Sequence, residues 1–109
     1  GRSKDMIITG GLNVYPKEVE LVLDEINGVS ESAVIGVPHL DFGETVVAVI
    51  VRNSSSIEPG EKEIISSAKD QLAKYKLPKR VIFVDQLPRN SMSKVQKNIL
   101  RDNYKNLFS

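Results

Sequence analysis

A polar loop that runs into a helical pattern holds the residues of this sequence best suited to chemistry. The stretch LPRNSMSKVQKNILR, residues 87–101, contains two arginines and two lysines and places Lys94 where the helical spacing begins. Residues 1–73 carry six basic and twelve acidic side chains, whereas residues 74–105 carry nine basic and two acidic ones. Such local positive charge is expected where a domain meets a phosphate-bearing ligand, although a solvated basic helix would give the same count.

Cysteine and histidine usage excludes several kinds of site. The chain has no cysteine, which removes disulfides, thiolate metal sites and thiol catalysis. Its one histidine, His39, is best explained as a polar turn residue, so we expect no metal site. Walker-type, GxGxxG and Ser/His/Asp patterns are all missing, and the residues alone therefore predict no self-contained catalytic site.

The length and composition indicate one globular domain. The 109 residues allow one modest core, and 40% hydrophobic with 27% charged residues is typical of globular proteins. The longest apolar run, VVAVIV at residues 46–51, is far too short to cross a bilayer. The polar start GRSKD does not resemble a signal peptide. We therefore expect a cytoplasmic protein with no membrane span.

The first part of the chain predicts a hairpin and a helix that must position any site. Gly10 and Gly11 separate the apolar runs MII and LNV, and paired glycines favour the positive φ angles of tight hairpin turns. Tyr15 and Pro16 then open a helix, which Gly28 ends. Its inward stripe consists of Val19, Val22, Leu23 and Ile26.

The remainder predicts strands at residues 29–37, 44–52 and 79–85, a helix at residues 61–74 and a final helix after Lys94. The run VVAVIV is too apolar for a strand with one wet face, so we expect it at the centre of the sheet. The predicted class is α+β, with a small three-stranded sheet packed with helices plus the N-terminal two-stranded hairpin. The inward residues of the two helices are predicted to be Ile64, Ile65, Ala68 and Leu72, and then Val95, Ile99, Leu100 and Tyr104.

Two long stretches resemble the adenylate-forming enzymes, a family that includes acyl-CoA synthetases, peptide-synthetase adenylation domains and luciferase. GRSKDMIITGGLNVYPKEVE, residues 1–20, is similar to the eighth core motif of that family. KYKLPKRVIFVDQLPRNSMSKVQK, residues 74–97, is similar to the ninth and tenth, and VIGVPHLDFGE lies between them. Among family members, the chain looks most similar to bacterial malonyl-CoA synthetases.

The resemblance implies that residues 1–109 are the small C-terminal cap of a larger enzyme, whose N-terminal domain binds ATP and the acid. A carboxylate, such as malonate or a fatty acid, would attack the α-phosphate of ATP, and the CoA thiol would then displace AMP. ATP, Mg²⁺ and CoA would serve the full enzyme, with none held tightly by the cap alone. We expect the cap by itself to be inactive.

By the resemblance, Lys94 is the catalytic lysine, which brings its ammonium to the carboxylate and the α-phosphate. The residue before it is Ser93, where the family usually has glycine, so a left-handed backbone there would be strained. A lysine acetyltransferase acting on Lys94 would remove its charge and silence the first half-reaction. Arg2 would bind the nucleotide ribose, and Lys4 matches the hinge about which the cap reorients.

The resemblance also implies CoA contacts. The hairpin of Gly10 and Gly11 would line the pantetheine tunnel, because glycine lets a backbone approach a narrow ligand closely. Tyr75, Lys76 and Lys79 fall in the loop that meets the CoA adenine and phosphates in related synthetases. For each residue a plain structural role stays open: a tight turn for the glycines and a solvated loop for the others.

Two other functions remain open from the sequence. A nucleic-acid-binding domain would use the basic segment 74–105, but the net charge is only +1 and few of the six aromatic residues lie among the basic ones. A noncatalytic interaction domain would have no need to keep Arg2, Lys4 and Lys94 together. We therefore expect neither function, and no nucleic-acid partner.

Overall fold

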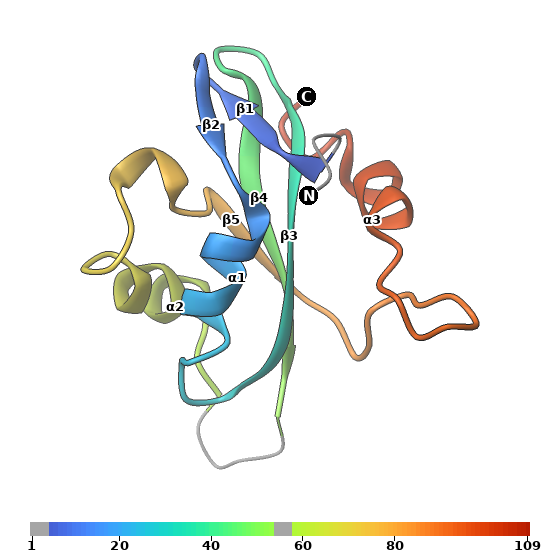
Figure 1. Cartoon of the computed structure of the whole chain (residues 1–109). Coiled ribbons are helices and arrows are strands. Elements are labelled where there is room, and N and C mark those ends of the chain that lie inside the picture. Colours follow the sequence, from blue (N-terminus) through green and yellow to red (C-terminus); the bar gives the residue numbers. More distant parts are fainter. Residues whose placement is uncertain (1–4, 54–57) are drawn as a thin grey trace.

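The computed structural model describes residues 5–53 and 58–109, so the predicted roles of Arg2 and Lys4 fall outside the described residues. One mixed sheet is covered by α1 and α2 on one face and by α3 on the other (Figure 1). The elements are β1 (Ile7–Thr9), β2 (Leu12–Val14), α1 (Pro16–Leu23), β3 (Val29–His39), β4 (Gly43–Arg52), α2 (Glu61–Ala68), the 3₁₀ helix η2 (Lys74–Lys76), β5 (Arg80–Phe83) and α3 (Lys97–Tyr104).

Strand β4 is the centre of the sheet, as its apolar sequence predicts. It pairs antiparallel with β3 along one edge and parallel with β5 along the other. Successive side chains of a strand point to opposite faces. Val46, Ala48 and Ile50 accordingly enter the core under α1 and α2, while Val47 and Val49 enter the core under α3. Both faces of β4 are buried, which explains why apolar and polar residues do not alternate along this strand.

The predicted hairpin is confirmed, and it continues the sheet. Gly10 and Gly11 have φ angles of 57° and 84°, as a tight primed turn requires. Thr9 of β1 pairs with Gly43 of β4, which makes a five-stranded sheet of the predicted α+β class. The amide of Gly10 also donates to the carbonyl oxygen of Phe42 at 3.0 Å, so the hairpin tip is tied to the β3–β4 turn.

Several predictions about the helices were wrong in detail. Helix α1 ends at Leu23 and not at Gly28, and Val95 lies before α3, which begins at Lys97. Helix α2 ends at Ala68, not at residue 74, because the chain turns there: the amides of Gln71 and Leu72 both donate to the Ala68 carbonyl. Ile99 is 42% exposed, because it is one residue, about 100° of helical rotation, from the buried Leu100. Within the described residues, no helix combines the length and apolar character needed to cross a membrane.

Gly36 of β3 lets the hairpin lie close to the sheet. A Cβ atom at this position would lie 3.0 Å from Cγ1 of Ile7 and 3.0 Å from Oε2 of Glu44. Glu44 also accepts a hydrogen bond from the amide of Ile8 at 2.9 Å. Ile7 and Ile8 both belong to β1, so the absence of a side chain at Gly36 allows β1 to pack closely against β3.

We predict that Gly36→Ala lowers the free energy of unfolding by roughly 1–3 kcal/mol, because the added methyl group overpacks the contact with Ile7. Chemical denaturation measures the change. The exposed Ser30→Ala on the same strand is the control, with an expected change within about 0.5 kcal/mol. Equal stability of the two variants would contradict the close seating of β1.

Candidate functional site

The segment that carries Lys94 forms a tight turn, which we call the Lys94 loop (residues 88–96). The Ser93 amide donates to the Asn90 carbonyl at 2.9 Å, and the Asn90 amide donates to the Lys94 carbonyl at 3.0 Å. Arg89 and Val95 form an isolated antiparallel bridge across its base. This arrangement is typical of a short hairpin whose last turn residue adopts the left-handed conformation.

Ser93 is the residue that adopts that conformation. Its φ of 67° is the one positive φ of a non-glycine residue in the described part of the chain. Glycine is favoured at such a position, because a Cβ atom costs roughly 1–2 kcal/mol there. The predicted strain at Ser93 is therefore present, and the hydrogen bonds around Ser93 must hold the turn against it.

Side chains fix the loop from within. Oδ1 of Asn90 accepts hydrogen bonds from the amides of Met92 at 2.9 Å and Lys94 at 3.0 Å. Nη1 of Arg89 donates to the Ser93 carbonyl oxygen at 2.6 Å, and the same guanidinium forms an ion pair with Glu31 of β3. Both the N–H and the C=O of Lys94 are thus bonded to Asn90.

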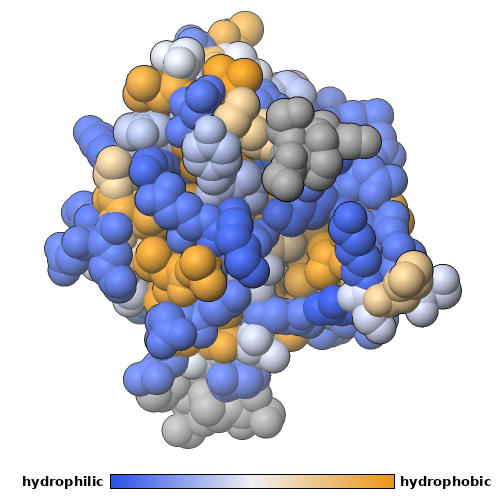
Figure 2. All heavy atoms as spheres, in the orientation of Figure 1, coloured by the Kyte–Doolittle hydropathy of each residue, from blue (hydrophilic) through white to orange (hydrophobic). Residues whose placement is uncertain are grey.

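The side chain of Lys94 is exposed and makes no ion pair with any carboxylate in residues 5–53 or 58–109. It borders an open hollow of about 760 Å³, here called the α3 hollow. In the space-filling view a hollow separates the projecting loop from the body of the domain (Figure 2). The lining residues are Asp5, Lys17, Glu20, Asn90, Lys94, Val95, Gln96, Lys97, Asn98 and Arg101.

The α3 hollow is basic. Its two carboxylates are already paired: Glu20 lies 2.7 Å from Nζ of Lys97, and Asp5 lies 3.3 Å from Nη1 of Arg101. Lys17 and Lys94 remain without a carboxylate partner among the described residues. The uncompensated charge around the hollow is therefore positive, which suits an anionic ligand.

A second hollow of about 430 Å³, here called the hairpin hollow, brings together three of the residues predicted to contact CoA: Gly10, Tyr75 and Lys79. The ammonium of Lys79 also lies 4.8 Å from the centre of the Phe42 ring, within cation–π range. The lining residues are Thr9, Gly10, Leu12, Phe42, Thr45, Lys74, Tyr75, Leu77 and Lys79.

The other two predicted CoA residues are placed differently. Lys76 turns to Glu18 of α1, with Nζ 3.0 Å from each carboxylate oxygen, and this hydrogen bond raises the pKa of Lys76 above its ordinary value. Lys74, which the sequence did not single out, lines the hollow in its place. Gly11 lies at the hairpin tip, where a Cβ atom would meet nothing within 4 Å.

The two hollows are lined by different segments of the chain. The α3 hollow is lined by residues of α1, of the Lys94 loop and of α3, whereas the hairpin hollow is lined by residues of the hairpin, of the β3–β4 turn and of the segment around η2. They have no lining residue in common. The two hollows are therefore separate candidate sites.

Sequence reasoning also missed Glu20 and Lys97. They are far apart in the chain, and each alone reads as an ordinary helix charge of the kind that lies in solvent. The structure brings them into contact, and both line the α3 hollow together with Lys94. Only the fold reveals this pair, since no local spacing connects α1 with α3.

Comparisons with known proteins identify the family of this chain. The family model of the AMP-binding enzyme C-terminal domain matches residues 18–94. The long-chain-fatty-acid–CoA ligase FadD13 of Mycobacterium tuberculosis is 47% identical over 103 residues, which cover 94% of this chain and 20% of that protein. The putative acyl–CoA ligase YdaB of Bacillus subtilis is 45% identical over 102 residues, with coverage of 94% and 20%.

Solved structures give the same result. The crystal structure of apo MatB from Rhodopseudomonas palustris superposes with a TM-score of 0.93 at 58% identity, covering 100% of this chain and 22% of that one. This chain thus spans about a fifth of the length of the curated relatives it matches. The match to the family model and the high identity to its members show that the chain belongs to the AMP-binding enzyme C-terminal domain family.

Proposed function

We propose that residues 1–109 are the mobile C-terminal domain of an AMP-forming acid–CoA ligase, and that Lys94 is its catalytic lysine. The observation that carries the proposal is an unpaired ammonium on a loop whose backbone is hydrogen-bonded on both sides, in a member of this family. The remainder of such a ligase would supply the pockets for ATP and the acid. The nucleic-acid-binding and noncatalytic alternatives are not favoured, since the relatives are acyl-CoA ligases.

In the first half-reaction, a carboxylate oxygen attacks the α-phosphorus of ATP and pyrophosphate leaves. Negative charge gathers on the carboxylate and the phosphate in the transition state, and Lys94 neutralises it. A compact ammonium can bridge two anionic groups more readily than a planar guanidinium. A preorganised donor of this kind is worth about 3–4 kcal/mol, or roughly 10²–10³ in rate.

In the second half-reaction, the CoA thiol attacks the acyl carbon and AMP leaves. The hairpin hollow would then face the ligand. Tyr75 offers an aromatic face for the adenine, and Lys74 and Lys79 offer ammonium groups for the phosphates of CoA. The CoA contact of Lys76 stays a prediction, and the Lys76 ammonium is paired with Glu18 in this structure.

The acid is most simply a small dicarboxylate such as malonate. MatB is 58% identical to this chain, whereas FadD13, named for long-chain fatty acids, is 47% identical. Mg²⁺ would accompany ATP in the full enzyme. Residues 5–53 and 58–109 bring no three Asp, Glu or His side chains together around a metal ion, so the proposal assigns none of them to it.

The hinge at Lys4 and the ribose contact of Arg2 stay predictions, as do the cytoplasmic location and acetylation of Lys94. We infer a hinge because the α3 hollow and the hairpin hollow are separate sites with no lining residue in common. Rotation of the domain between half-reactions would present each in turn.

We predict that Lys94→Ala in the full-length enzyme lowers acid-dependent pyrophosphate release by roughly 10² or more, because the charge in the transition state loses its counter-ion. Malonate and a long-chain fatty acid are each supplied as the acid. Transfer to CoA from preformed acyl-adenylate is expected to stay within about twofold, because that step needs no ammonium at the α-phosphate.

The control for this substitution is Lys62→Ala, which changes an exposed lysine of α2 that lines neither hollow and is expected to leave both rates unchanged. Equal losses in the two half-reactions of Lys94→Ala would rule out the proposed role.

For the hairpin, we predict that Gly11→Leu slows thioester formation by roughly tenfold or more while pyrophosphate release survives. A leucine side chain would project from the tip into the space that the pantetheine arm needs, and its backbone would be strained at a φ of 84°.

Gly11→Asn separates the two effects, because asparagine tolerates positive φ and projects less far. It is expected to retain most of the CoA step. An unchanged CoA step in Gly11→Leu would refute the tunnel assignment.

A further inference from the structure

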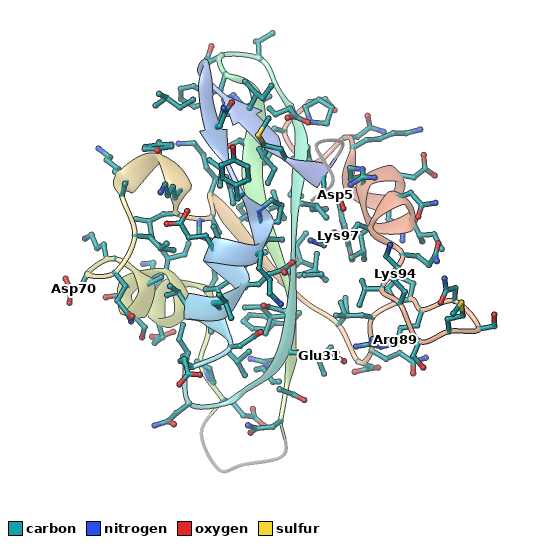
Figure 3. All side chains as sticks on the ribbon, in the orientation of Figure 1. Asp5, Glu31, Asp70, Arg89, Lys94 and Lys97 are labelled. Atoms are coloured by element: carbon teal, nitrogen blue, oxygen red, sulfur yellow. The ribbon has the colours of Figure 1, made fainter. Side chains whose placement is uncertain are left out.

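Ion pairs hold the chain on both sides of Lys94, one to β3 and one to α1. On one side, Arg89 forms an ion pair with Glu31 of β3. On the other side, Lys97, the first residue of α3, places Nζ 2.7 Å from Oε2 of Glu20. Figure 3 shows Arg89, Lys94 and Lys97 together on the α3 side of the sheet. Lys94 thus lies between two cationic residues that are each held by a carboxylate.

Glu20 does more than neutralise Lys97. The same Oε2 oxygen accepts a hydrogen bond from the amide of Val34 at 2.9 Å. Strand β3 is the last strand of the sheet order, with β4 on one side only. An edge strand leaves amides without ladder partners. The Glu20 carboxylate satisfies one of them, and so connects three elements: α1, which carries it, the edge of β3, and the start of α3.

The two ion pairs differ in how strongly they can hold the loop. The side chains of Arg89 and Glu31 are 40% and 34% exposed, so water screens their attraction. The side chains of Lys97 and Glu20 are only 18% and 15% exposed. Removing one partner of a shielded pair leaves the other charge without compensation, which is the costlier change. Of the two ion pairs, Glu20–Lys97 is therefore the stronger attachment.

We propose that Glu20 and Lys97 are positioning residues for Lys94: their ion pair sets the direction in which the start of α3 presents the Lys94 ammonium. The inference rests on the proposed role of Lys94 and adds the two residues that orient it. Lys97 itself is unsuited to the ligand, because Glu20 already neutralises its charge. A shift of about 1 Å in a catalytic group can cost roughly 10² in rate, so loss of this attachment has a measurable effect.

The test uses the full-length ligase with Glu20→Gln and Lys97→Met. The glutamine keeps an acceptor for the Val34 amide and removes only the charge, while the methionine removes the cation from the surface of α3. We expect each variant to lower the maximal rate of acid-dependent pyrophosphate release by roughly tenfold, with the KM for ATP within about twofold. Thioester formation from preformed acyl-adenylate is expected to stay within about twofold.

Two further variants separate positioning from general destabilisation. Lys97→Arg keeps a cation opposite Glu20 and is expected to restore most of the first half-reaction. Lys105→Met removes the lysine that follows α3 and pairs locally with Asp102 at 3.1 Å, and is expected to leave both half-reactions unchanged. Melting temperatures of all variants are recorded alongside the rates.

The proposal is overturned if Glu20→Gln and Lys97→Met retain the normal rate of pyrophosphate release in an enzyme that Lys94→Ala disables. It is also overturned if both half-reactions fall by one factor together with the melting temperature, because that pattern reports unfolding. Failure of the proposed function looks different: Lys94→Ala itself would then leave pyrophosphate release intact, and the positioning role would fall with it.

Discussion

The hydrogen bonds between Asn90 and the backbone of Lys94 are the interaction on which this account depends. They fix where the Lys94 side chain leaves the loop, while the ammonium at its end keeps no partner among the described residues. A charge that was already paired inside the domain would have to break that pair before it could meet a phosphate. In this loop the backbone of Lys94 is hydrogen-bonded while its ammonium has no carboxylate partner among the described residues. The loop keeps this arrangement although Ser93 adopts a strained left-handed conformation.

The sheet gives this loop a rigid base. Because β4 is buried on both faces, the two cores share one strand, and the helices on either side cannot shift independently of it. The α3 hollow and the hairpin hollow are therefore separate sites on one body, with no lining residue in common. Motion that brings first one and then the other to a ligand must be motion of the whole domain, which is the reason a hinge belongs to the proposal.

The sequence predicted the features that depend on residues close together in the chain. The apolar run 46–51 indicated a doubly buried strand, and Gly10 with Gly11 indicated the hairpin turn. The helix at residues 61–74 was predicted too long, since its apolar spacing continues to Leu72 although the backbone turns after Ala68. The pairing of Lys76 with Glu18 was not foreseen, because Glu18 lies on α1 and no spacing rule connects the two. The ion pair between Glu20 and Lys97 was missed for the same reason, because it joins α1 to α3. Long-range pairs of charges become visible only once the fold has brought them together.

The most direct measurement of the central claim is a structure of the full-length enzyme with a stable acyl-adenylate analogue bound. The account predicts Nζ of Lys94 within about 3 Å of a phosphate or carboxylate oxygen of the analogue, at hydrogen-bond distance, with the Asn90 contacts to its backbone unchanged. A structure of that complex with the α3 hollow facing the analogue, but with the Lys94 ammonium directed into solvent or paired with a carboxylate of its own domain, would contradict it.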